Sequence, residues 1–105
     1  MSDRELLELA AKAAGMPTHT DGVGVVMAHH PSWNPLTDDG DALRLAVKLG
    51  LDLDLHGCNS THPYACAFDC NRNISEEEQP DNGDPCAATR RAIVRAAAEI
   101  GRNKT

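Results

Sequence analysis

Apolar residues recur at helical spacing between residues 37 and 50, and this is the clearest pattern in the chain. Leu43, Ala46 and Val47 fall on one face of the expected helix. Thr37 stands just before the run and is followed by acidic residues that suit the positive end of a helix dipole, namely Asp38, Asp39 and Asp41. Gly50 supplies the stop, because glycine tolerates the left-handed backbone at which many helices end. The pattern predicts a helix between Thr37 and Gly50 whose buried face contains Leu43, Ala46 and Val47.

Directly after Gly50 the pattern changes to a period of two, which is typical of strands. The leucines at positions 51, 53 and 55 alternate with polar residues, which are Asp52, Asp54 and His56. A second alternation follows, with Tyr64, Cys66, Phe68 and Cys70 on one face and Ala65, Ala67 and Asp69 on the other. We interpret Leu51–Cys70 as two antiparallel strands joined by an irregular loop over residues 57–63, with the Phe68 face turned inward.

Both ends of the chain carry helix signals. Ser2 and Glu5 form a capping box ahead of an apolar stripe that Gly15 ends, and the stripe consists of Leu6, Leu9, Ala10 and Ala13. Near the other end, Asp84 stands as an N-cap with Pro85 at the first helical position. The apolar stripe of this helix consists of Ile93, Ala96, Ala97 and Ile100. We predict one helix at each end, each with one buried face.

The remaining segments give weaker patterns. Residues 18–22 suggest a turn, and Gly22–Ala28 is a short valine-rich run that we interpret as a strand. Residues 71–83 are polar and acidic, so we expect a mobile loop there. The predicted order is α-β-α-β-β-α in one domain over residues 1–105. It is an α+β fold, an α/β sandwich in which three helices flank a small antiparallel sheet of about three strands.

The composition is that of an ordinary globular protein, with 41% hydrophobic and 25% charged residues among 105. The formal net charge of −6 argues against binding to nucleic acid or to an anionic membrane. No apolar run approaches the roughly 20 residues of a membrane span, and residues 1–15 lack the pattern of a secretion signal. We therefore expect a cytoplasmic protein whose cysteines are thiols or metal ligands rather than bridges.

Imidazole and thiol groups, which bind zinc, are concentrated between residues 56 and 70. The candidate ligands are His56, Cys58, His62, Cys66 and Cys70. Their spacing lacks a C-x2-C knuckle, and on one strand Cys66 and Cys70 would lie about 13 Å apart, too far to share one zinc ion. Cysteines that fill an apolar face beside Phe68 explain the pattern more simply. The preferred interpretation therefore expects no cofactor, and zinc binding is the alternative hypothesis.

Two further groups of polar residues have both a functional and an ordinary structural explanation. The row of Asp52, Asp54 and His56 resembles a hydrolase or magnesium cluster, yet any sheet with one wet face also has such a row. The basic patch consists of Arg90, Arg91, Arg95 and Arg102. We expect these arginines to pair with acids of the chain itself, including the segment Glu76–Glu78, rather than with nucleic acid.

Three blocks of the chain resemble a family of small tailed-phage and prophage proteins of unknown function, the phage α/β/α sandwich domain proteins. The blocks are SDRELLELAAKAAG, WNPLTDDGDALRLAVKLGLDL and DPCAATRRAIVRAAAEIGR, and together they cover roughly half of the chain. The resemblance implies a phage origin, a sandwich fold and expression in the cytoplasm of an infected or lysogenic bacterium. It implies no activity, because the family has no catalytic or binding residues to carry over.

These observations together predict a non-enzymatic accessory protein that binds a host protein, for example as an inhibitor of a bacterial defence system. An acidic protein suits a host partner with a basic surface. We expect recognition at two acidic groups, the helix-start residues Asp38, Asp39 and Asp41 and the loop residues Glu76, Glu77, Glu78 and Asp81. Alanine-rich helices also permit a homodimer.

Overall fold

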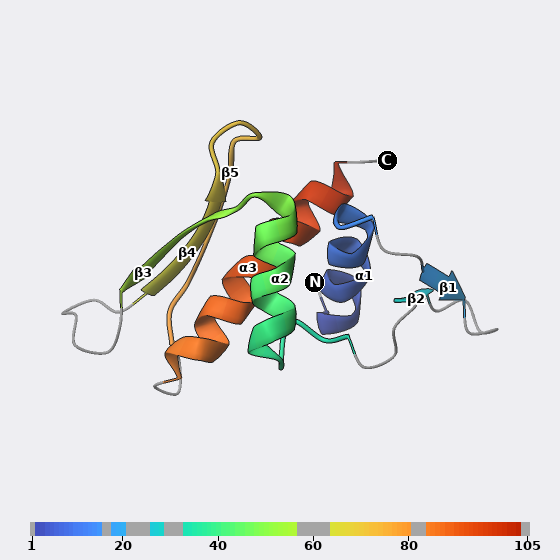
Figure 1. Ribbon diagram of the computed structural model, residues 1–105, viewed down its shortest axis with the longest axis horizontal. Coiled ribbons are helices and arrows are strands. Elements are labelled where there is room, and N and C mark those ends of the chain that lie inside the picture. The colour runs from blue at the N-terminus through green and yellow to red at the C-terminus, as the bar shows by residue number, and fades with distance from the viewer. Residues whose placement is uncertain are drawn as a thin grey trace.

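The computed structural model describes residues 2–15, 18–20, 26–28, 33–56, 64–80 and 84–103. In these residues the chain forms three helices, which are α1 (Asp3–Ala13), α2 (Asp39–Leu49) and α3 (Pro85–Arg102). It also forms five strands, which are β1 (Thr18–Thr20), β2 (Val26–Ala28), β3 (Asp52–His56), β4 (Tyr64–Asp69) and β5 (Ile74–Glu78). Figure 1 shows these elements along the chain. The α+β class predicted from the sequence is confirmed.

Helix α3 is the centre of the fold. It packs against β4 and β5 on one side and against α1 and α2 on its other sides, as Figure 1 illustrates. A helix surrounded in this way must carry small apolar side chains around most of its circumference. Its buried residues are indeed mainly small: Ala88, Ala92, Ile93, Val94, Ala96, Ala97, Ala98, Ile100 and Gly101. The expected stripe of Ile93, Ala96, Ala97 and Ile100 is confirmed. Of the three helices, α3 packs on β4 and β5, while α1 and α2 pack on α3.

The main sheet has the strand order β3-β4-β5, and both pairs are antiparallel. Leu53 lies opposite Ala67, and Ala67 lies opposite Glu76, so these side chains share the face that α3 covers. Asp54, Cys66 and Glu77 share the other face in the same way. The antiparallel pairing of the two segments within Leu51–Cys70 was predicted correctly.

The third strand of this sheet differs from the predicted one. The segment 71–83 was expected to be a loop, but Ile74–Glu78 within it forms β5. The strand Gly22–Ala28 is described only at Val26–Ala28, where it pairs with Thr18–Thr20 in a separate two-stranded sheet. The prediction of a turn is therefore wrong for Thr18–Thr20. Glutamates have low strand propensity, so tertiary contacts rather than local preference place Glu76–Glu78 in a sheet.

The inward face of β4 is the opposite of the predicted one. Ala65, Ala67 and Asp69 are buried, whereas Tyr64, Cys66 and Phe68 are only half-buried on the outer face. An alanine face fits because α3 is itself alanine-rich and lies close to the strand. The interpretation that cysteines fill the inner face is therefore wrong for Cys66, and Cys70 is exposed.

The buried face of α2 is likewise rotated from the predicted one. Ala42, Leu45 and Ala46 are buried, while Leu43 is 57% and Val47 73% exposed. Ala46 belongs to both faces, which is why the sequence pattern did not distinguish them. The prediction that Leu43 and Val47 are core residues is wrong.

Side-chain caps set the starts of the helices. Ser2 and Asp84 accept hydrogen bonds from the backbone N–H groups of Glu5 and Ala87, as their N-cap positions predict. In α2 the cap is Asp38, which accepts from the Asp41 N–H, rather than Thr37. Gly50 ends α2 with a left-handed φ of 67°, as predicted.

A buried carboxylate organises the turn between β4 and β5. Asp69 is 7% exposed and accepts hydrogen bonds from the backbone N–H groups of Asn71 and Arg72 and from the Arg72 side chain. The hydrogen bond from the Arg72 side chain, followed by those from the backbone, holds the pKa of Asp69 below its ordinary value against the opposing effect of burial. Asp69 thus stabilises the turn in its charged form.

This arrangement predicts an acid-sensitive contribution to stability. Because the folded-state pKa of Asp69 is lowered, its contribution is present above the unfolded-state value of about 4 and is lost as the pH falls through the folded-state value. We expect Asp69→Asn to be less stable than the unmodified protein at pH 7, and the difference to shrink as the pH falls below about 4. Urea unfolding across this range measures it, and a pH-independent difference would contradict the role of the charge.

Candidate functional site

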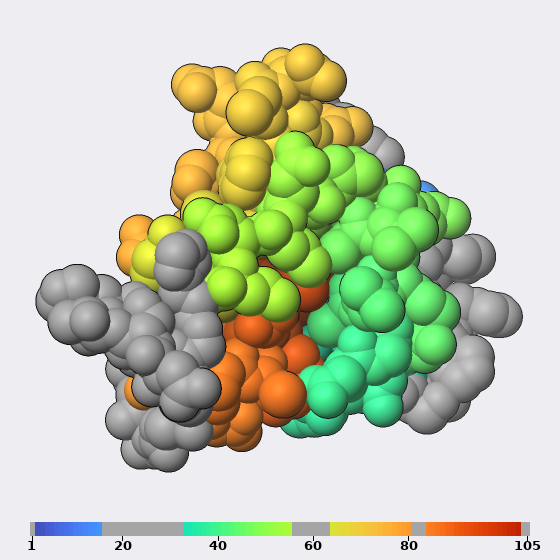
Figure 2. Space-filling view, turned by 60° about the vertical axis from the view of Figure 1, so that its left-hand side comes forward, coloured from blue at the N-terminus to red at the C-terminus, as the bar shows by residue number. Residues whose placement is uncertain are grey.

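An apolar cleft lies where α2, β3 and α3 meet. It has a volume of about 390 Å³, and its apolar lining comes from all three elements: Ala42, Leu43, Leu53, Leu55, Ala88 and Ile93. Figure 2 shows the hollow where the yellow-green atoms of β3, the green atoms of α2 and the orange atoms of α3 come together. The volume falls within the range of roughly 300 to 1,000 Å³ that is common for ligand sites.

The cleft forms because α2 packs on α3 and not on the neighbouring strand β3. Helix α3 covers β4 and β5, but β3 extends beyond it. Among the described residues of the inner side of β3, Leu53 still packs against the core, whereas Leu55 is 57% exposed although its side of the strand is the apolar one. Leu43 projects at the α2 side of the same cleft and is equally exposed. Two large apolar side chains thus meet solvent at one opening, which is typical of an interaction site.

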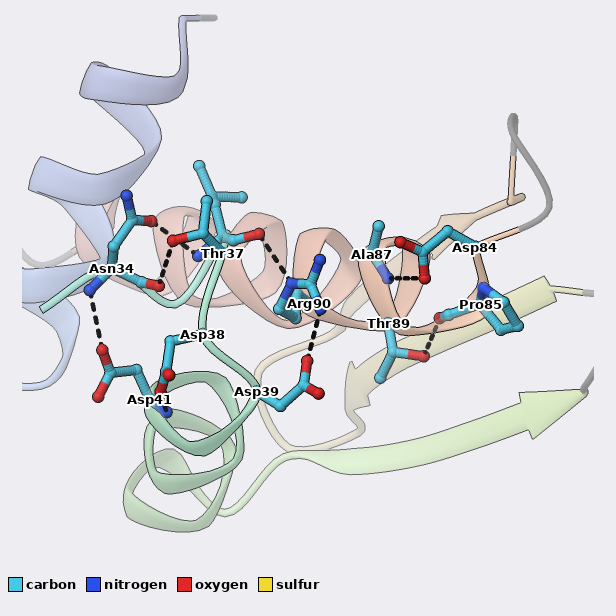
Figure 3. A network of polar contacts seen from close by, with 11 residues as sticks. Asn34, Thr37, Asp38, Asp39, Asp41, Asp84, Pro85, Ala87, Thr89 and Arg90 are labelled. Atoms are coloured by element: carbon cyan, nitrogen blue, oxygen red, sulfur yellow. Dashed lines mark hydrogen bonds and ion pairs between the residues drawn. The ribbon is translucent and has the colours of Figure 1, made fainter.

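One end of the cleft is closed by a polar clamp centred on Arg90. Its Nε donates to the backbone oxygen of Leu36 at 2.8 Å, and its guanidinium pairs with Asp39 at 2.5 Å. Figure 3 shows this clamp between the start of α2 and the first turns of α3. The Arg90 side chain is 17% exposed, so the clamp is a partly desolvated contact and holds α2 at a set position on α3.

The aspartates at the start of α2 have structural partners of their own. Asp38 caps the helix, and Asp41 accepts from the backbone N–H of Asn34 at 2.9 Å and from the Arg44 side chain at 2.7 Å. Asp39 binds Arg90, as described. All three predicted recognition acids therefore lie together at one end of α2, where they stabilise the local fold. Asp39 and Asp38 still have exposed side chains, at 69% and 59%.

The second predicted acidic group is divided between the two faces of β5. Glu76 and Glu78 point toward α3, where Arg95 pairs with them at 3.0 and 2.5 Å. Arg91 lies 3.6 Å from Glu78 and 3.3 Å from Asp3 of α1. The hydrogen bond to Glu78, opposed by burial and helped by the neighbouring charges, raises the pKa of Arg95. The prediction that these arginines pair with Glu76–Glu78 is confirmed for Glu76 and Glu78, and a partner protein would have to displace them.

A polar cavity of about 350 Å³ lies over this network. Its charged lining is balanced, with Arg91, Arg95 and Arg102 facing Glu76, Glu78 and Glu99. Arg102 pairs with Glu99 at 3.2 Å. Among the described residues that line the cavity, the positive and negative charges are therefore equal in number, and the cations have acidic partners.

The outer face of the main sheet is acidic. Asp52 and Asp54 are exposed on β3, and Glu77 is exposed on β5. Tyr64 donates to Asp54 Oδ2 at 3.2 Å, and partial burial followed by the charge of Asp54 raises the pKa of Tyr64. No described helix covers this face, so the wet-face interpretation of the aspartate row is confirmed for Asp52 and Asp54.

Only some of the candidate zinc ligands lie among the described residues. Cys58, His62 and also Asp81 of the acidic group lie outside the described residues, and of His56 only the backbone is described. Cys66 lies on the outer face of β4 with its Sγ 3.4 Å from Ser75 Oγ, and Cys70 is exposed in the turn that follows. Within the part of the chain that is described, no three His, Cys, Asp or Glu side chains converge as a metal site would require.

The cleft was not predicted from the sequence, because Leu43 was assigned to the buried face of its helix. A signal for the correct face of α2 was present, since Ala42, Leu45, Ala46 and Leu49 have the complete i, i+3, i+4, i+7 spacing. Nothing in the sequence indicated that Leu55 would be exposed on the inner side of β3.

The helices of the described residues include none with the length and apolar composition needed to cross a membrane. Comparisons of the chain with family models, with curated proteins and with solved structures found no match.

Proposed function

We propose that this chain is a non-enzymatic accessory protein, encoded by a phage or prophage, that binds a host protein with a basic surface in the bacterial cytoplasm. Inhibition of a bacterial defence system is one concrete form of this function. The single observation that carries the binding role is the apolar cleft with Leu43 and Leu55 exposed at its opening. The phage origin is supported by the resemblance of the three sequence blocks.

The surroundings of the cleft support a protein partner over a small-molecule substrate. The exposed surface of the lining is almost entirely apolar. Of its ionisable groups, Arg90 and Asp39 are bound to each other, Tyr64 donates to Asp54, and Cys86 is a single exposed thiol. A catalytic site would need polar groups that converge on the reacting atoms. An apolar side chain of a partner fits such a lining, and the net charge of −6 favours a basic surface around it.

Charge substitutions at two exposed positions of α2 test this proposal. Leu43 lines the cleft, whereas Val47, one helical turn further, is more exposed and does not line it. We expect Leu43→Lys to reduce the recovery of a specific partner from bacterial lysate by about tenfold or more, because a desolvated apolar contact at an interface centre is worth about 2 kcal/mol. The matched variant Val47→Lys should recover the partner as the unmodified protein does.

Both variants should keep the native circular dichroism spectrum, since neither side chain is buried. The measurement is quantitative mass spectrometry of the captured proteins. Equal loss with both variants, or no loss with Leu43→Lys, would show that the cleft is not the binding site.

A further inference from the structure

The backbone of β3 offers a binding element beside the cleft. In the described sheet β3 is an edge strand that pairs only with β4. An unpaired edge presents N–H and C=O groups that can add a further strand from another chain. The edge of β3 also borders the cleft, since Leu53 and Leu55 of the same strand line it.

The two sides of β3 have opposite chemistry. Leu53 and Leu55 point to the cleft side, and Asp52 and Asp54 are exposed on the outer side. In paired strands, side chains directly opposite each other share one face and lie about 4.5 to 5.5 Å apart at Cβ. A strand added along β3 would therefore place alternate side chains in the cleft and beside the two aspartates.

From this geometry we infer that β3 receives an extended segment of a basic protein partner in which apolar residues alternate with lysine or arginine. The apolar residues enter the cleft beside Leu43 and Leu55, and the basic residues lie beside Asp52 and Asp54. This inference rests on the proposed function and specifies how the partner is recognised. The charges of Asp52 and Asp54 on the outer side of β3 and the apolar lining of the cleft on its inner side are both complementary to such an alternating segment.

A second copy of this chain does not satisfy the same requirements. Two β3 strands paired with each other would bring Asp52 and Asp54 of one copy beside those of the other, and like charges on directly opposed strands are destabilising. The aspartates thus protect the edge against self-association, and they leave it open to a basic segment.

Two synthetic peptides of identical composition test the inference. One alternates, Leu-Lys-Leu-Lys-Leu-Lys, and the other is blocked, Leu-Leu-Leu-Lys-Lys-Lys. We expect the alternating peptide to bind the full chain at least about tenfold more tightly by fluorescence anisotropy, and hydrogen exchange of the β3 amides to slow on binding. Equal affinity of the two peptides, or unchanged exchange in β3, would overturn the inference.

N-methylation of the peptide separates backbone pairing from side-chain packing. Only alternate N–H groups of an added strand face β3. Methylation of one alternate set should therefore abolish binding, and methylation of the other set should preserve it. If both methylated peptides bind as the unmodified one does, the segment does not add as a strand.

Protein variants test the charge requirement with a matched control. Asp52→Lys reverses a charge next to the added strand, whereas Glu77→Lys makes the same change on the same face but on β5, at the opposite edge. At physiological salt, charges farther apart than about 8 Å are largely screened. We expect Asp52→Lys to lower the affinity for the alternating peptide by about 3- to 10-fold. Glu77→Lys should change this affinity less than twofold. An equal effect of both variants would contradict local recognition.

The outcomes distinguish this inference from the proposed function. If Leu43→Lys abolishes the capture of a partner but neither peptide binds, the partner uses the cleft without strand addition, and the inference fails alone. If the alternating peptide binds at β3 but capture is insensitive to Leu43→Lys, the proposed function fails.

Discussion

Gly101→Ala should destabilise the protein by about 3 kcal/mol or more, although alanine is the better helix former by about 1 kcal/mol. Gly101 lies in the last turn of α3, where a Cβ would stand 2.0 Å from the backbone oxygen of Leu9 and 2.8 Å from its carbonyl carbon. Both atoms belong to the backbone of α1, so no side chain can rotate away. The two helices would have to separate, and the alanine packing between them would open.

Thermal and urea unfolding measure this effect. For a domain of this size, about 3 kcal/mol corresponds to a fall in Tm of roughly 12 to 24 °C. Because the free energy of unfolding of small domains is only about 5 to 15 kcal/mol, the Gly101→Ala variant should lose a large part of its stability. A Tm within a few degrees of the unmodified protein would show that α1 and α3 are not in close contact at this point.

Gly40→Ala is the matched control, because it is the same substitution at a helical glycine. A Cβ there would meet the guanidinium of Arg44 at 3.2 Å and Asp38 Oδ2 at 3.3 Å. These are the ends of side chains rather than backbone atoms. The Arg44 side chain is 73% exposed, so it can shift by a few tenths of an ångström, and so small a shift leaves Asp38 within reach of the Asp41 N–H that it caps. We expect a change within about 0.5 kcal/mol, or a gain of up to about 1 kcal/mol from helix propensity. Opposite signs at Gly101 and Gly40 would separate backbone contact from helix propensity.

Leu45→Ala should cost about 2 to 5 kcal/mol, whereas Val47→Ala should change the free energy of unfolding by less than about 0.5 kcal/mol. Leu45 is 3% exposed in the core formed by α2 and α3, so its truncation leaves a cavity. Val47 is 73% exposed on the same helix, and its truncation removes almost no buried surface. Intrinsic helix propensities of ordinary residues differ by at most about 0.7 kcal/mol, which is too little to explain the expected difference.

Urea unfolding of the two variants decides which face of α2 is buried. The alternative face, with Leu43, Ala46 and Val47 inward, predicts the reverse order of stabilities. If Val47→Ala were the more destabilising of the two, the cleft would also be wrong, because Leu43 would no longer reach its opening.

The local signals of the sequence determined where most of the described helices and strands begin and end. Ser2 and Asp84 cap their helices, Pro85 opens α3, and Gly50 ends α2 as their chemistry requires. These features depend on a few neighbouring residues, so they can be seen in the chain alone. The pairing of β3 with β4 was equally accessible, because two alternating segments separated by a short connection form a hairpin.

The tertiary structure alone decided which faces are buried. Both sides of β4 carry small or apolar residues, and Ala46 belongs to two possible faces of α2, so the hydrophobic pattern was consistent with either orientation. The choice follows from α3, whose alanine surface fits the Ala65 and Ala67 side of β4 and whose arginines require Glu76 and Glu78 on that side of β5. Burial is a property of contacts between segments distant in sequence, and for that reason the cleft beside β3 was visible only once those segments were brought together.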